Sequence, residues 1–110
     1  MIFIAVRFMI RPEYSEDWLD RVADFTAATR AEPGNLWFDW SRSVDDPNEF
    51  VLLEAFRDGA AGGEHVASDH FRTAMKIMPE ALAETPRIIN VEVPGTEWSR
   101  MGELEVPPRD

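Results

Sequence analysis

The feature that most constrains the fold of this 110-residue chain is a set of strand-like segments whose two alternating faces are both apolar. Segment 2–10 carries large aliphatic and aromatic side chains at its even positions, and its odd positions are also apolar except at Arg7. Segment 50–57 repeats this pattern at most of its positions. Because strand side chains alternate between the two faces of a sheet, a sheet built from these segments needs apolar cover on both sides.

The remaining segments predict an α+β domain. The expected elements, in order, are a strand at 2–10, a helix from the N-cap Ser15 to the stop at Pro33-Gly34, strands at 36–44 and 50–57 joined by a hairpin loop at 45–48, helical segments within 58–78 with Ser68 as a second start, a short helix at 80–84 after Pro79, and a strand at 87–93. This is a β-α-β-β-α-β order with one antiparallel sheet, and right-handed crossovers place both helical layers on the same face.

The second apolar face of such a sheet has no cover in the chain itself, so the sequence predicts a homodimer that buries it. Residues 1–95 form the predicted domain, and residues 96–110 form a tail after Pro94-Gly95. The apolar residues of this tail are Trp98, Met101, Leu104 and Val106. They lead us to expect that the tail packs on the partner subunit.

Composition excludes several classes of function. Lys and Arg total 11 against 21 Asp and Glu, and the net charge of -10 disfavours nucleic acid and anionic membrane surfaces as partners. The absence of cysteine excludes disulfides, thiolate nucleophiles and cysteine-ligated metals, and fits a cytoplasmic location. No apolar run approaches the length needed to span a membrane.

Three stretches resemble the antibiotic biosynthesis monooxygenase family, especially its quinol-monooxygenase-like members. They are EPGNLWFDWSRSVDDP at 32–47, FVLLEAFRD at 50–58 and EHVASDHF at 64–71. The resemblance implies a ferredoxin-like domain that pairs into a dimeric α+β barrel, with a pocket between the sheet and the helices. It further implies oxidation of a small aromatic polyphenol or quinol by O2 without metal, flavin or haem, the substrate supplying the electrons.

His65 is the first candidate catalytic residue, because an imidazole can accept a phenolic proton near neutral pH and the resemblance places this position on the helix that faces the pocket. The alternative is a structural histidine bonded to a carbonyl group or to solvent. His70 lies five residues further on, about 500° around a continuous helix, so we expect it to point away from His65 and to form no metal site with it.

Arg7 is the second candidate catalytic residue, since its guanidinium could stabilise a phenolate or a reduced oxygen anion in the pocket. The alternative role is an ion pair with a buried acid, for which Asp39 and Glu54 are the candidate partners. Asp39 is also grouped with the expected substrate-binding residues.

The other expected substrate-binding residues are apolar. Phe38, Trp40 and Phe56 come from the sheet, and Phe71 and Met75 come from the second helical layer. Stacking on a planar substrate would use the aromatic rings, although core packing or a dimer interface would use them equally well.

Three other functions stay open on the same fold. A haem-degrading relative is disfavoured, because Met75, Arg7 and His65 stand where the resemblance expects an iron-binding histidine, an asparagine and a tryptophan. An isomerase acting on a small sugar-like substrate fits an aromatic pocket poorly. A non-catalytic ligand-binding dimer remains possible from the sequence alone.

Overall fold

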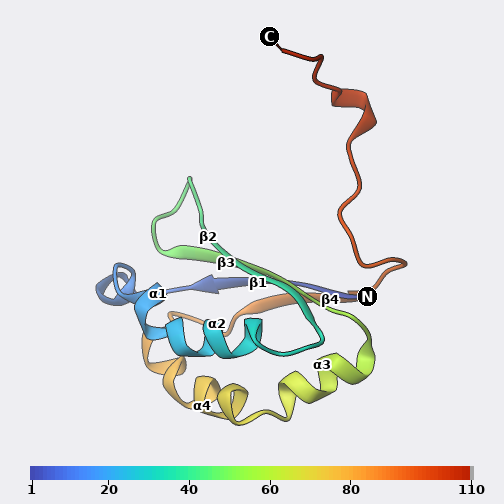
Figure 1. The fold of residues 1–110 in the computed structure, drawn as a ribbon. Helices are drawn as coiled ribbons and strands as arrows, with labels where there is room; N and C mark the ends of the chain where they lie inside the picture. Colours follow the sequence, from blue (N-terminus) through green and yellow to red (C-terminus); the bar gives the residue numbers. More distant parts are fainter. Residues whose placement is uncertain (110) are drawn as a thin grey trace.

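The computed structural model describes residues 1–109. The strands are β1 (Ile2–Met9), β2 (Asn35–Arg42), β3 (Glu49–Phe56) and β4 (Arg87–Glu92); the helices are α1 (Trp18–Arg21), α2 (Ala23–Arg30), α3 (Gly59–Val66) and α4 (Asp69–Ile77). The strands pair antiparallel in the order β2-β3-β1-β4 (Figure 1). The predicted α+β, ferredoxin-like arrangement is confirmed.

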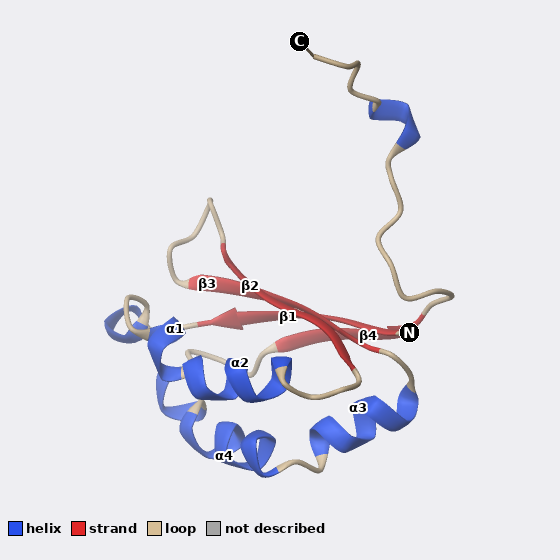
Figure 2. Cartoon of the chain, viewed as in Figure 1, coloured by secondary structure: helices blue, strands red, loops and turns tan. Residues whose placement is uncertain are grey.

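The sheet divides the molecule into two unlike sides. All four helices lie on one side, and the other side carries no helix among the described residues of the domain (Figure 2). We call the covered side the inner face and the other side the outer face. The register of β1 against β3 and β4 places Ile4, Val6 and Phe8 on the inner face, and Phe3, Ala5 and Arg7 on the outer face.

The core fills the space between the inner face and the helices. At one end, the ring of Phe8 packs at 5.7 Å from Trp18 and at 5.0 Å from Trp40, measured between ring centroids. At the other end, Phe25 of α2 meets Phe38 of β2 edge-on at 5.5 Å. Aromatic pairs at these separations add to the stabilisation that burial supplies, so the helices are held firmly on this face.

The N-terminal helical segment differs from its prediction. Ser15 does not cap a helix; its hydroxyl lies 2.6 Å from the Asn48 side-chain oxygen, after a 3-10 helix at Pro12–Tyr14. The helix is also split into α1 and α2 at Val22, whose backbone φ of -100° and ψ of 9° leave the helical region. The predicted second start at Ser68 is confirmed, because its hydroxyl accepts a hydrogen bond from the Phe71 backbone N–H at 3.2 Å.

Beyond β4, the chain leaves the sheet. The Pro94-Gly95 turn sends the tail to the side of the sheet opposite the helices (Figure 1). The tail contains a 3-10 helix at Gly102–Leu104. No helix among the described residues is long and apolar enough to cross a membrane.

Candidate active site

A cavity of about 590 Å³ lies between the inner face of the sheet and the helices. Its sheet wall includes Ile4, Val6 and Leu52, and its helix wall includes Phe25, Phe71 and Met75. Ile88 and Asn90 of β4 complete one side. The walls are mainly apolar, and the volume suits a ligand the size of a small aromatic molecule.

His65 and Glu54 are the ionisable groups at the deep, buried part of this cavity. The imidazole of His65 is sandwiched by apolar rings, with Phe56 at 4.8 Å and Phe71 at 5.2 Å between centroids. Asp58 caps the helix that carries His65 by accepting a hydrogen bond from the Ala61 N–H at 2.9 Å, a bond that lowers the pKa of the Asp58 carboxyl.

A glycine brings the loop after α2 against α3. A Cβ atom built on Gly34 would lie 2.3 Å from the Cβ of Ala61, which no pair of side chains tolerates. Gly34 therefore permits a close approach that a larger residue would prevent. The same loop carries Glu32, so this contact sets how near Glu32 comes to the helix that carries His65.

Glu32 joins two histidines through one carboxylate oxygen. Its Oε2 lies 2.8 Å from Nδ1 of His65 and 2.5 Å from Nε2 of His70. Side-chain exposure rises along this chain of groups, from 6% for His65 to 15% for Glu32 and 24% for His70. The three groups thus form a hydrogen-bonded path from the buried cavity to the surface.

This geometry corrects the expectation for His70. We expected His70 to point away from His65, but the two rings lie 6.0 Å apart between centroids. The expectation assumed a continuous helix. The chain instead breaks between α3 and α4 at Ala67 and Ser68, and the new helix direction returns His70 to the same side.

Glu54 of β3 faces the other nitrogen of His65. Its Oε1 lies 3.9 Å from Nε2, and its side chain is 9% exposed. Burial first, and then the neighbouring Glu32 carboxylate, raise the pKa of Glu54 to about 7. A carboxyl group in this state is partly protonated at neutral pH and can both donate and accept a proton there.

The same cluster has the donor atoms that a divalent cation uses. Glu32, His65 and His70 each offer one ligand atom, and all three lie within 4.8 Å of one another. The two oxygen-to-nitrogen distances are nevertheless those of hydrogen bonds. Ligands around one zinc ion at about 2.1 Å would stand roughly 3.3 Å apart, so binding a metal would require the cluster to open.

The predicted substrate-binding residues separate into two groups. Phe71 and Met75 line the cavity beside His65. Phe38 and Phe56 are fully buried beneath it, where they support the His65 ring, and neither lines the cavity. Trp40 lies at a separate depression near α2 and donates a hydrogen bond from its indole nitrogen to Thr26.

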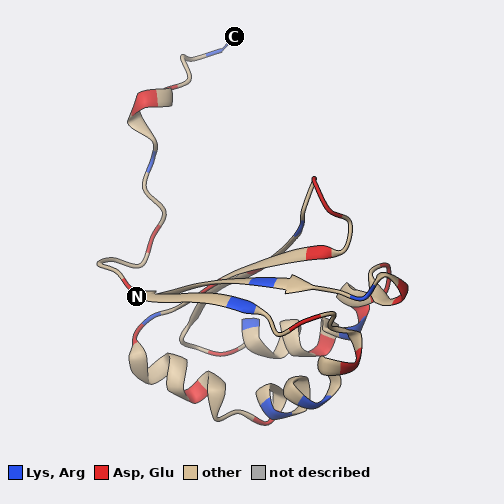
Figure 3. Cartoon of the chain, turned by 180° about the vertical axis from the view of Figure 1, so that it is seen from behind, with Lys and Arg blue, Asp and Glu red and all other residues tan. Residues whose placement is uncertain are grey.

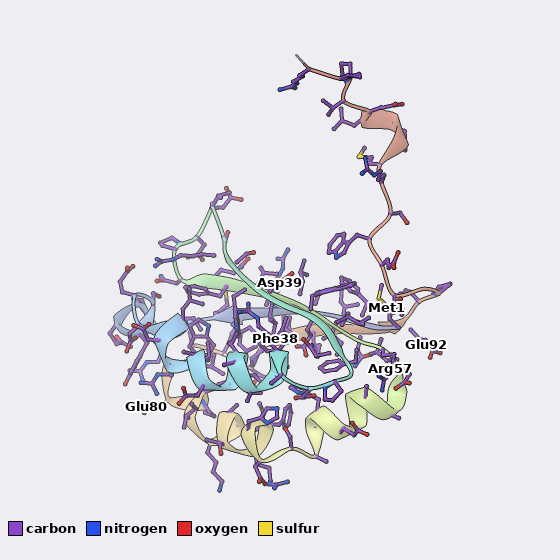
Figure 4. All side chains as sticks on the ribbon, viewed as in Figure 1. Met1, Phe38, Asp39, Arg57, Glu80 and Glu92 are labelled. Carbon is purple, nitrogen blue, oxygen red and sulfur yellow. The ribbon has the colours of Figure 1, made fainter. Side chains whose placement is uncertain are left out.

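Arg7 and Asp39 lie on the outer face, away from the cavity. Figure 4 shows Asp39 on the side of the sheet opposite Phe38, as strand alternation requires. Arg7 is exposed in the single chain, and within residues 1–109 it makes no ion pair with Asp39 or Glu54. The expectation that Arg7 acts in the pocket beside His65 is therefore not supported, since odd positions of β1 face outward.

Glu32 and Asn90 were not predicted as site residues from the sequence, and Glu54 was expected only as a partner for Arg7. The sequence did contain a signal for Glu54. It stands at an even-numbered position of its strand, as Leu52 and Phe56 do, so strand alternation places it on the core side. An acid among core positions is costly unless it has a role or a partner. No local signal marked Glu32, which reaches the site from a loop.

Comparison with known proteins places these features in a family. The family model described as "Antibiotic biosynthesis monooxygenase" matches residues 1–77. The protein named "Putative monooxygenase YcnE" from Bacillus subtilis (strain 168) is 29% identical over 93 residues, which cover 84% of this chain and 98% of that protein.

Two solved structures share the fold. The structure of Rv0793 from Mycobacterium tuberculosis has a TM-score of 0.78 at 28% identity, covering 89% of this chain and 98% of that chain. The structure described as "Putative antibiotic biosynthesis monooxygenase from Nitrosomonas europaea" has a TM-score of 0.79 at 24% identity, covering 86% of this chain and 100% of that chain.

Proposed function

Because this chain belongs to the antibiotic biosynthesis monooxygenase family, we propose that it is a cofactor-independent monooxygenase that oxidises a small aromatic polyphenol or quinol with O2. The observation that carries this proposal is the apolar cavity beside His65, whose Nδ1 is held by Glu32. The family supports monooxygenase chemistry in general, and the cavity supports the class of substrate.

The cavity favours a flat, mainly apolar substrate. Its walls offer aromatic and aliphatic contacts from Phe25, Phe71 and Ile4, with polar groups confined to few positions. A sugar-like substrate would leave most of its hydroxyl groups without hydrogen-bond partners there, which costs free energy for each unpaired group. This disfavours an isomerase acting on a polar substrate.

His65 is the proposed general base. The Glu32 carboxylate accepts a hydrogen bond from Nδ1–H, so the Nε2 lone pair is left free to accept a phenolic proton. The resulting phenolate is electron-rich and reduces O2, and a ring carbon then bonds to oxygen as a peroxide.

The electrons balance without a cofactor. When the O–O bond breaks, one oxygen atom stays on the ring and the other leaves as water with two hydrogens from the substrate. A quinol thereby becomes a hydroxyquinone, and the four electrons that O2 requires all come from the substrate. Glu54, with its pKa near 7, is the proposed donor of a proton to the departing oxygen, and it regains that proton from the His65 imidazolium, whose Nε2 lies 3.9 Å from Oε1, so both hydrogens of the water derive from the substrate.

We also propose that the protein is a homodimer assembled through the outer face, and that it works in the cytoplasm. The face is apolar at Phe3, Leu53 and Val91 and carries no helix of its own. Such a surface is typical of an interface between subunits. The lack of cysteine fits a reducing compartment.

An oxygen electrode with a panel of hydroquinones and anthrones tests the function. We expect O2 uptake with at least one compound, and a loss of about 100-fold or more in kcat for His65→Ala. The matched control is Arg72→Ala on the exposed face of α4, which should keep its activity. Ligand binding without O2 uptake would identify a non-catalytic binding protein, and unchanged uptake in His65→Ala would refute the role of His65.

A further inference from the structure

The tail starts from a firmly held point at the end of the sheet. The backbone nitrogen of Met1 donates to the carbonyl oxygens of Val93 at 2.7 Å and Gly95 at 3.0 Å. Gly95 has a φ of 81°, which an L side chain rarely adopts, and it turns the chain out of the plane of the sheet. From there, residues 96–109, which we call the arm, run along the side that the outer face opens to (Figure 1).

The side chains of the arm, residues 96–109, are all exposed in the single chain. Trp98 packs on Trp37 of the outer face at 5.4 Å between ring centroids. Met101, Leu104 and Val106 further along are 65%, 72% and 63% exposed. Holding an extended segment costs conformational entropy at each residue. The three exposed apolar side chains gain no hydrophobic stabilisation in the single chain, because they remain in water.

The outer face has two further unmet requirements. Arg7 and Arg87 are directly opposite each other on β1 and β4, where like charges destabilise a sheet unless acids approach them, and Figure 3 shows basic positions on these two strands. Arg87 lies 3.8 Å from the Glu84 carboxylate, whereas Arg7 has no ion-pair partner among residues 1–109. The indole nitrogen of Trp37 is buried without a hydrogen-bond partner.

The arm carries apolar side chains and acids that could cover the outer face and approach its arginines. Its acids are Glu97, Glu103 and Glu105. A second copy seated on the outer face would lie beside the arm, because both occupy the same side of the sheet.

From these observations we infer that the arm docks on a second copy of this chain and clamps the dimer, its apolar side chains covering that copy and its acids approaching the partner subunit's Arg7 and Arg87. The contact is reciprocal, as two-fold symmetry requires, so each dimer has two arms in place. This inference rests on the proposed homodimer and adds to it a segment that the ferredoxin-like unit does not need.

Sedimentation equilibrium of the full-length chain tests the energetic claim. The variant Met101→Ser/Leu104→Ser/Val106→Ser should raise the dimer Kd by about 10-fold or more, while circular dichroism stays unchanged. The matched control, Thr96→Ala/Ser99→Ala/Arg109→Ala, changes the same number of arm residues at polar positions and should leave the Kd within about twofold. An equal Kd in both variants would overturn the inference.

Crosslinking tests which molecule the arm touches. Since the chain has no cysteine, Leu104→Cys labelled with a benzophenone maleimide places one photoreactive group on the arm. We expect a dimer-sized product on a denaturing gel. If the label reacts only with its own chain, the arm folds back on its own subunit. That result would contradict the docking of the arm on the partner without contradicting the dimer. A full-length chain that sediments as a monomer at 50 μM, about the range of a weak dimer, would instead refute the proposed dimer, and the arm inference with it.

Discussion

The two faces of the sheet are built from the same strands but differ in what covers them. The inner face is covered by four helices, and its buried acid, Glu54, lies at the cavity, where it faces His65 of α3. The outer face is also largely apolar along β1 and β3, yet it exposes Arg7 and Arg87 side by side. The difference teaches that alternation decides which side a residue faces, while the neighbouring layer decides what the residue does there.

A charge placed on the outer face should have the largest effect on assembly. Leu53→Asp buries one carboxylate from each subunit in the proposed interface, and the cost of several kcal/mol predicts a rise in dimer Kd of about 10³-fold. Sedimentation equilibrium measures it. Thr73→Asp, which adds the same charge at an exposed position of α4 on the other side of the sheet, is the control and should change the Kd little.

Replacing one carboxylate with an amide should lower the activity on the helix side of the sheet but not on the outer face. Glu32→Gln replaces the carboxylate shared by both imidazoles with a neutral amide that has one weaker acceptor and one NH2 donor, so the tautomer of His65 is no longer fixed, and we expect kcat to fall about 100-fold with little change in KM. Asp39→Asn makes the same chemical change on the outer face and should alter kcat less than about twofold. Equal losses would contradict the assignment of the site to the inner face.

The pH dependence of stability should report Glu54. Its pKa of about 7, against an ordinary value of 4.5, means that the folded protein holds this proton more tightly than the unfolded chain. Stability therefore falls as the pH rises from about 4.5 to 7, and levels off above that range. Glu54→Gln should stabilise the protein by about 2–3 kcal/mol at pH 8 relative to its effect at pH 4.

Urea denaturation at the two pH values measures this difference. Glu64→Gln, at an exposed position of α3, is the matched control and should show no such pH-dependent gain. An identical effect of Glu54→Gln at pH 4 and pH 8 would mean that burial does not raise the pKa of Glu54.

The close approach behind the site should appear as a smaller effect on stability. Gly34→Ala adds a methyl group 2.3 Å from the Cβ of Ala61, so α3 and the Glu32 loop must separate, at a cost of about 2 kcal/mol. Gly63→Ala adds the same group within α3 where nothing lies within 4 Å, and it should stabilise the helix by up to about 1 kcal/mol. Thermal denaturation of both variants measures the contrast.

Much of the fold followed from local patterns. The four strands were predicted within two residues of their observed ends, because turn residues and proline bound each apolar run. The helical region after the first strand was predicted, but neither its start nor its division into α1 and α2 was, and Ser15 bonds instead to Asn48, 33 residues away. A capping residue is a local signal that a distant hydrogen bond can override.

The candidate site followed only in part. His65, Phe71 and Met75 were expected at the cavity and line it. The family resemblance pointed to His65, and Phe71 and Met75 lie four residues apart on α4, which places them on one side of that helix. Arg7 was expected there because it is the one charge in an apolar strand, but its odd position turns it outward. The same alternating pattern that made Arg7 stand out also shows that its odd-numbered position lies on the outer face.

The sequence by itself determined the order of strands and helices, the apolar character of both faces and the side of the sheet that each strand residue occupies, because these depend on neighbours a few positions away. The tertiary structure alone decided that Glu32, His65 and His70 share hydrogen bonds. Their meeting depends on the angle at which α4 follows α3 and on the contact of Gly34 with Ala61, and packing between elements sets both.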